Sequence, residues 1–182
     1  TLVMNAEMKL AHIFAGHWLY SWKKACAAAD EIYRIPIREQ ADVVIASCGG
    51  YPKDMSLYQG TKTIDNVESA LKPGGTLIIF MEAIDGGGPS EYFDWIHPLV
   101  AGTIGKDLRA HFTVPGYIFF LNCEQAKRYH ILMLTSVPAE TLAPMGIRAF
   151  QNMEDLLVAA DLQGKSIYIV PNGATVIPYV EK

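Results

Sequence analysis

Three polar side chains with complementary chemistry stand close together in the first third of the chain: Tyr58, Gln59 and Lys62. Residues three and four apart share one face of a helix, so this spacing would gather a phenol, an amide and an ammonium group. Such a set suits a small carboxylate that also carries a hydroxyl, with the lysine pairing the carboxylate and the other two orienting its polar substituents. A solvated helix face with an interfacial tyrosine fits the same spacing, and both interpretations stay open at this point.

A glycine-rich loop precedes these residues. Gly49 and Gly50 lack a Cβ, so the backbone there can turn sharply and approach a ligand closely. Pro52 lies in the same loop, and Asp54 is the expected N-cap of a helix over residues 55–71. The unpaired N–H groups and positive dipole end of that helix would favour an anion. A plain strand-to-helix turn is the alternative.

The elements around this loop are expected to form a β-α-β unit. Residues 42–47 (DVVIAS) and 76–81 (TLIIFM) are short apolar runs typical of strands buried on both faces, and residues 72–75 (KPGG) predict a turn. Two strands joined through a helix are parallel with a right-handed crossover. Ligands of such sheets bind beyond the carboxyl ends of the strands, which is where the glycine loop would lie.

The rest of the chain alternates in the same way. Two short strands are expected within residues 2–15 and a helix over residues 17–33, on which Trp18, Trp22, Cys26, Ala29 and Tyr33 recur at three- and four-residue steps. Further segments are expected as follows: an amphipathic segment over 90–100, helices over 103–111 and 152–162, strands over 130–135 and 166–170, and either strand or helix over 117–128. This order predicts a single α/β domain over residues 1–182, with three layers and a Rossmann-like, mostly parallel sheet that carries helices on both faces.

Composition argues against several functional classes. The net charge is −4 with a pI of about 5.7, and no Lys/Arg cluster marks a nucleic-acid-binding face. Three widely spaced cysteines disfavour a disulfide framework or a zinc site and indicate reduced thiols. No apolar run approaches the roughly 20 residues of a membrane span, and no secretory signal is visible. A cytoplasmic protein is therefore expected, and its start at Thr1 suggests a trimmed chain or part of a longer reading frame.

Motifs of self-contained catalysis are missing from the sequence. The five histidines show no metal-binding spacing, so no metal site is expected in this chain. His97 and His111 could serve as an acid or base, but lone histidines are more often structural or merely exposed. The segment SCGG is not the G-x-S-x-G elbow of hydrolases, and G-x-G-x-x-G is absent. Residues 71–79 (LKPGGTLII) are similar to a late strand of methyltransferases that use S-adenosylmethionine, but the earlier glycine-rich loop of those proteins is not found.

Residues 41–66 as a whole resemble the lactate racemases that use a nickel-pincer nucleotide. The family pattern is roughly G-G-x-P-x-D followed by Y-Q-x-x-K, and here it is met by Gly49, Gly50, Pro52, Asp54, Tyr58, Gln59 and Lys62. Weaker similarity lies in FAG before the first helix, in KPGGTLII and in PNGATVIP. The whole chain resembles the C-terminal half of that two-domain family, with the N-terminal, cofactor-bearing half absent.

This resemblance implies inversion of the C2 centre of a 2-hydroxy acid. In the family, a hydride passes from C2 to the cofactor and returns to the other face, while paired histidines act on the substrate hydroxyl. The resemblance assigns substrate binding to Tyr58, Gln59 and Lys62, and an aromatic wall to Tyr117 or Trp95. The cofactor lysine, the nickel ligand and the catalytic histidines belong to the N-terminal half, so this chain alone should hold no cofactor. The rival hypothesis is a non-catalytic module that binds small carboxylates or serves assembly.

Overall fold

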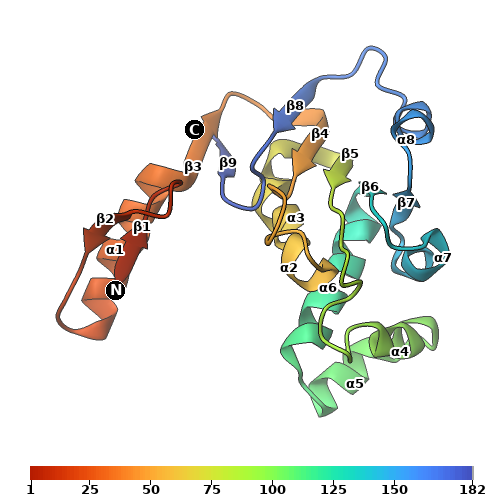
Figure 1. The fold of residues 1–182 in the computed structure, drawn as a ribbon, viewed down its shortest axis with the longest axis horizontal. Helices are drawn as coiled ribbons and strands as arrows, with labels where there is room; N and C mark the ends of the chain where they lie inside the picture. Colours follow the sequence, from red (N-terminus) through yellow and green to blue (C-terminus); the bar gives the residue numbers. More distant parts are fainter. Residues whose placement is uncertain (182) are drawn as a thin grey trace.

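A five-stranded parallel sheet forms the body of the molecule. The computed structural model describes residues 1–181. The strands lie in the order β7-β6-β5-β4-β8, and every neighbouring pair is parallel (Figure 1). Their bounds are Ala41–Ser47 (β4), Leu71–Phe80 (β5), His130–Leu134 (β6), Arg148–Phe150 (β7) and Ile167–Val170 (β8). The predicted α/β class with a mostly parallel sheet is confirmed.

Helices cover both faces of this sheet. The larger hydrophobic cluster joins one sheet face to the helices α3 (Lys62–Val67) and α6 (Val114–Arg128). The smaller cluster packs Leu156 and Ala160 of α8 (Met153–Ala160) against the sheet's other face, at Ile78 and its neighbours. Side chains of β4 and β5 therefore meet apolar partners on both sides, which explains why these runs carry so few polar residues.

Two predicted segments differ in detail from the structure. The turn expected at 72–75 lies inside β5, where pairing with β4 jumps from Ala41–Leu71 to Val43–Thr76, so the intervening residues bulge out. The ambiguous segment 117–128 is part of helix α6. Thr113 caps this helix by accepting a hydrogen bond from the Gly116 N–H, and a proline in the first turn suits a helix start.

Short helices fill the remaining connections. They are α2 (Leu57–Gly60), η1 (Glu68–Ala70), η2 (Phe93–Trp95), α4 (Ile96–Val100), α5 (Ile104–Ala110), α7 (Ala139–Leu142) and η3 (Ala143–Met145). Helices α4 and α5 lie beyond the carboxyl end of the sheet, where the loop after β5 leads (Figure 1). Within the described residues, no helix combines the length and the apolar character needed to cross a bilayer.

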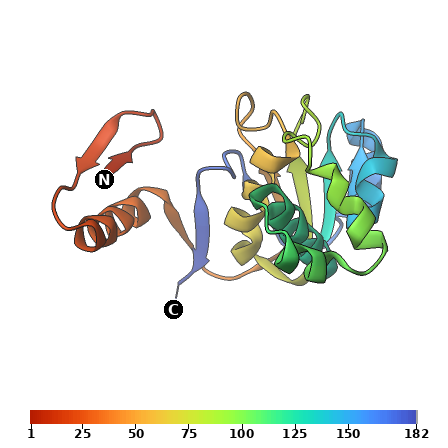
Figure 2. The same ribbon diagram turned by 90° about the horizontal axis from the view of Figure 1, so that it is seen from below.

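An N-terminal arm projects from this body. It consists of a hairpin of β1 (Leu2–Met4) and β2 (Leu10–Ile13), followed by α1 (Trp18–Tyr33). The chain then enters β3 (Arg34–Ile37), which pairs in parallel with β9 (Ile177–Val180). Both views show the arm standing away from the five-stranded sheet (Figures 1 and 2).

Helix α1 does not bury the tryptophans of its apolar stripe. Its buried residues are Ser21, Ala25 and Ala28, which face the hairpin, whereas Trp18 is 72% exposed and Trp22 is 54% exposed. Small side chains let the helix approach the hairpin closely, and that contact leaves the neighbouring tryptophan stripe in solvent.

Candidate functional site

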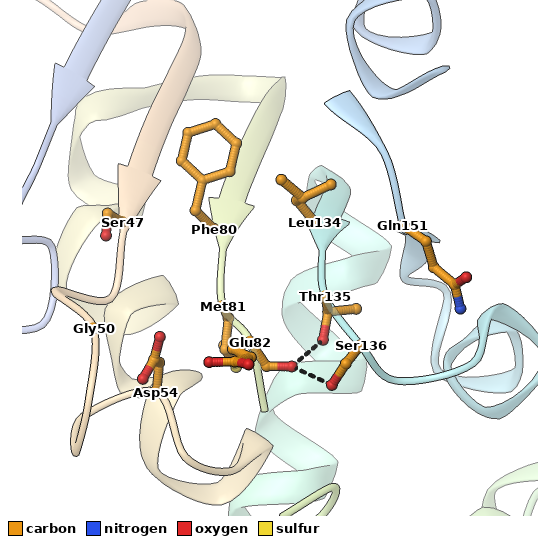
Figure 3. Close-up of a pocket in the computed structure, with 10 residues that line it drawn as sticks. All are labelled: Ser47, Gly50, Asp54, Phe80, Met81, Glu82, Leu134, Thr135, Ser136 and Gln151. Atoms are coloured by element: carbon orange, nitrogen blue, oxygen red, sulfur yellow. Dashed lines mark hydrogen bonds between the residues drawn. The ribbon is translucent and has the colours of Figure 1, made fainter. Parts of the chain in front are cut away.

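The carboxyl ends of four parallel strands surround a cavity of about 580 Å³. Its polar lining comes from Ser47 and Asp54 after β4, Glu82 after β5, and Thr135 and Ser136 after β6 (Figure 3). The hydroxyls of Thr135 and Ser136 donate to the Glu82 carbonyl at 3.1 and 2.6 Å, which ties the ends of β5 and β6 together. Two carboxylates and no lysine or arginine line this cavity, so by itself it disfavours an anion.

The glycine loop makes the sharp turn that its sequence predicts. Gly49 and Gly50 have φ values of +90° and +74°, a region that residues with a Cβ rarely adopt. The Gly49 N–H donates to the Ser47 hydroxyl at 3.0 Å. A side chain added at Gly49 would stand 3.6 Å from Asn172 Oδ1 and 3.9 Å from Lys53 Nζ, so these two polar groups face the turn.

The late segment PNGATVIP closes the other side of this loop. The Gly173 N–H donates to the Ser47 carbonyl at 2.8 Å, and the Asn66 amide donates to the Gly173 carbonyl at 2.9 Å. A Cβ on Gly173 would lie 2.5 Å from Thr63 Cγ2, so only glycine permits this approach. The segment therefore joins the end of β4 to helix α3.

The helix expected over 55–71 is broken into α2, α3 and η1, and Asp54 is not its cap. Ser56 occupies the N-cap position of α2, while Asp54 lines the cavity. The break falls at Thr61, whose hydroxyl and N–H both donate to the Leu57 carbonyl, at 2.5 and 2.9 Å. A threonine hydroxyl that bonds back to the preceding turn competes with the regular helical pattern and bends the chain.

The prediction of an anion site at the helix N-terminus is also wrong. The N–H groups of Leu57 and Tyr58 donate to the carbonyls of Gly86 and Gly87, at 2.9 and 3.3 Å. The loop after β5 folds over the start of α2 and uses the donors that an anion would need. The close approach requires glycine, because a Cβ on Gly88 would lie 2.8 Å from Ser56 Oγ.

The three polar residues do gather on one face, across the break between α2 and α3. Lys62 Nζ donates to Gln59 Oε1 at 2.8 Å and lies 5.7 Å from the centroid of the Tyr58 ring. Gln59 and Lys62 are exposed and Tyr58 is half-buried. Among the described residues, Lys62 forms no ion pair, so its charge is available to a ligand.

A buried polar network below this face was not found from the sequence. The Asn122 amide of α6 donates to the Tyr92 hydroxyl at 3.0 Å, and both side chains are buried. Burial raises the pKa of Tyr92, and hydrogen bonds with Asn122 and Thr61 partly offset that rise. This pair ties α6 to the segment that leads into η2.

A second link from α6 holds helix α3. Gln125 is fully buried and donates to Asp65 at 2.5 Å. Burial raises the pKa of Asp65, against the opposing effect of this hydrogen bond. Asn122 and Gln125 stand three residues apart on the helix, among apolar neighbours, so they share one face. Two polar residues at this spacing on an apolar face are the sequence signal that could have indicated a buried polar network.

The two aromatic candidates for a site wall have different surroundings. The Trp95 ring lies against Gly116 at the start of α6, where any side chain would collide with it. Tyr117 is exposed, and its ring lies tilted against that of Phe112 with the centroids 6.2 Å apart. Both line a separate cavity of about 340 Å³, together with Arg109. Neither Trp95 nor Tyr117 lines the cavity at the strand ends.

Metal-ligating side chains and free cysteine thiols are further candidates for reactive groups among residues 1–181. No cluster of three His, Cys, Asp or Glu side chains suited to a metal ion occurs there. Burial raises the pKa of the Cys48 thiol to about 11 and that of the Cys123 thiol to about 12, so both stay protonated and unreactive at neutral pH.

The model of the lactate racemase C-terminal domain family matches residues 37–178. The lactate racemase of Thermoanaerobacterium thermosaccharolyticum is 37% identical over 94 residues, which are 52% of this chain and 22% of that protein. The lactate racemase of Lactiplantibacillus plantarum is 32% identical over 92 residues, or 50% of this chain and 22% of that protein.

Two solved structures share the fold. The apoprotein of the Thermoanaerobacterium lactate racemase matches with a TM-score of 0.83 and 26% identity, over 100% of this chain and 45% of that one. A protein of Thermotoga maritima matches with a TM-score of 0.57 and 12% identity, over 90% of this chain and 42% of that chain. At this low identity, the match shows a similar fold and nothing more. The chain thus spans less than half the length of these solved relatives.

Proposed function

The chain belongs to the lactate racemase C-terminal domain family, as the resemblance of residues 41–66 predicted, and from this premise we propose that it is the substrate-facing domain of a 2-hydroxy-acid racemase or epimerase. The observation that supports this proposal most directly is the shared face of Tyr58, Gln59 and Lys62, whose lysine forms no ion pair within residues 1–181. Its relatives named lactate racemase are consistent with a substrate that has a carboxylate next to a hydroxyl-bearing carbon.

Each of the three side chains has a role in this proposal. The Lys62 ammonium pairs with the substrate carboxylate in a charge-assisted hydrogen bond. Gln59, which holds Lys62 at 2.8 Å, keeps the ammonium directed along the face and offers its amide to the substrate hydroxyl. The Tyr58 ring lies beside the ammonium and limits its movement, so the carboxylate is fixed in one orientation relative to C2.

The nickel-pincer nucleotide that the family implies would supply the chemistry at C2. The residues of this chain do not fit that group, because their donors are scattered and no suitable cluster occurs within residues 1–181. We therefore assign to this chain substrate binding and orientation only, and assign the cofactor and the acid and base to a preceding domain. The complete protein, encoded by the whole reading frame that contains this chain, is the molecule in which activity is expected.

Substitution of Lys62 in the complete protein tests this proposal. Lys62→Ala should raise KM for the 2-hydroxy acid about 10- to 150-fold, which corresponds to the loss of about 1.5–3 kcal/mol from one charge-assisted hydrogen bond, and should change kcat much less. Lys127→Ala is the matched control, because Lys127 is an exposed lysine of α6 that already pairs with Glu124 and should leave KM unchanged.

Equal kinetics for wild type and Lys62→Ala would refute the assignment of the carboxylate site. A complete protein that binds 2-hydroxy acids through Lys62 but leaves their configuration unchanged would be the small-carboxylate-binding module expected as the alternative.

A further inference from the structure

The N-terminal arm, residues 1–33, has seven exposed large apolar side chains and only three buried apolar residues. Its own core consists of Val3, Ala25 and Ala28, two of which are alanines. Its exposed large apolar side chains are Leu2, Met8, Leu10, Ile13, Trp18, Tyr20 and Trp22. A two-stranded hairpin with one helix is marginal in water even with a good core, so this arm needs a further partner.

One face of helix α1 concentrates this exposure. Trp18, Trp22 and Cys26 follow each other at four-residue steps, so they form one continuous stripe, and all three are exposed. The stripe lies beside the buried residues that hold α1 to the hairpin, whereas Lys23 and Ala27 lie on the side of the helix that points away from those residues. Tryptophans in such a position are typical of the energetic centre of an interface.

The body of the molecule does not cover this stripe. The main packing of α1 is with β1, β2 and β3, and both views show the arm reaching away from the five-stranded sheet (Figures 1 and 2). The family match begins only at residue 37, beyond the arm. The solved lactate racemase apoprotein nevertheless matches the whole of this chain, arm included, within a chain more than twice as long.

We propose that the Trp18–Trp22–Cys26 stripe is the surface on which the preceding domain of the complete protein docks, so that the arm is structurally part of that domain. This inference rests on the proposed function in assuming a preceding domain, but it concerns a surface remote from Lys62. We favour the preceding domain over a second copy of this chain as the partner. The solved lactate racemase apoprotein matches the whole of this chain, the arm included, and more than half of its own length lies outside the match. The short β3–β9 pair is then the connection across which the two domains are joined.

Native thiol alkylation of Cys26 in the complete protein tests the docked face. A matched control is the double variant Cys26→Ser with Ala27→Cys, which moves the thiol by one residue to the exposed far side of the same helix turn. Alkylation of each thiol with N-ethylmaleimide is followed over time by mass spectrometry of the α1 peptide. The thiol at position 26 should react at least tenfold more slowly than the thiol introduced at position 27.

Several outcomes would overturn the proposal. Equal, fast reaction at both positions would mean that the arm is free in the complete protein, and equal, slow reaction would mean that the cover extends around the helix and is not specific to the stripe. A position 26 rate that rises as the protein is diluted would assign the surface to a second copy, and a reading frame that adds no domain before Thr1 would remove the proposed partner. Because labelling does not require turnover, an inactive enzyme with a protected Cys26 would refute the proposed function and leave this inference standing.

Discussion

The α/β body and the N-terminal arm differ in how they use similar apolar sequences. In the body, β4, β5 and β6 bury their apolar residues between helices on both faces of the sheet. In the arm, a 16-residue helix with a clear apolar stripe buries mainly Ser21, Ala25 and Ala28. A hydrophobic pattern thus identifies the apolar face of a helix or strand. It does not tell whether the surface that covers this face lies in the same structural unit.

The strongest contrast should appear between one core residue and one arm residue. Ile78→Ala removes a fully buried side chain that packs with Leu156 of α8, and should lower the free energy of unfolding by about 2–5 kcal/mol. Trp22→Ser removes a larger side chain that is mostly in solvent, and in the 182-residue chain should change that free energy by no more than about 0.5 kcal/mol. Guanidinium unfolding followed by far-UV circular dichroism measures both, and similar losses for the two variants would show that the arm belongs to the body's core.

Much of the body, but little of its fine structure, could be predicted from the sequence. The strands at 42–47 and 76–81, the sharp turn at Gly49 and Gly50, and the shared face of Tyr58, Gln59 and Lys62 follow from local patterns. These features depend on residues that are close in sequence, where spacing alone decides which side chains meet.

Other features depend on residues distant in sequence. Asn122 of α6 pairs with Tyr92, and the N–H groups at the start of α2 donate to carbonyls of the loop at Gly86 and Gly87. No local pattern reveals such partners, so the sequence predicted one continuous helix with free N-terminal donors. The exposed tryptophan stripe of the arm was unpredictable for a related reason, since spacing gives a helix its apolar face but not its neighbour.

The buried network should have an intermediate effect. Asn122→Ala leaves the buried Tyr92 hydroxyl without its amide donor and should lower the free energy of unfolding by about 1–3 kcal/mol. Lys127→Ala, on the exposed side of the same helix, is the control and should lie within about 0.5 kcal/mol of wild type. Denaturant titration of both variants checks this, and a neutral Asn122→Ala would show that the hydrogen bond between Asn122 and Tyr92 does not stabilise the fold.

The smallest effect on stability is expected at the amino end of the sheet, where Asp42 links β4 to β5 and to the start of β8. Asp42 accepts hydrogen bonds from Lys72 Nζ at 2.7 Å and from the Ser166 hydroxyl and N–H at 2.6 and 2.9 Å. The Lys72 bond, followed by those from Ser166, lowers the pKa of the Asp42 carboxyl well below its usual range.

A lowered folded-state pKa stabilises the protein above the unfolded-state pKa of about 3.9, and this stabilisation is lost as the pH falls further toward the folded-state value. Asp42→Asn should therefore lower the melting temperature slightly at pH 7, and the difference from wild type should shrink as the pH falls below about 4. Thermal melts across that range measure it, and a difference that stays constant with pH would exclude the carboxylate charge as its cause.

We propose that this chain completes a racemase site, and the resemblance of residues 41–66 implies that the C2 hydrogen moves there as a hydride without exchange with water. The direct measurement supplies the complete protein with one enantiomer of a C2-deuterated 2-hydroxy acid in ordinary water and follows both enantiomers by chiral chromatography and mass spectrometry. The account predicts that the opposite enantiomer appears with deuterium retained at C2, because the family's chemistry removes and returns the same hydrogen. No inversion, or inversion with deuterium lost to solvent, would contradict it.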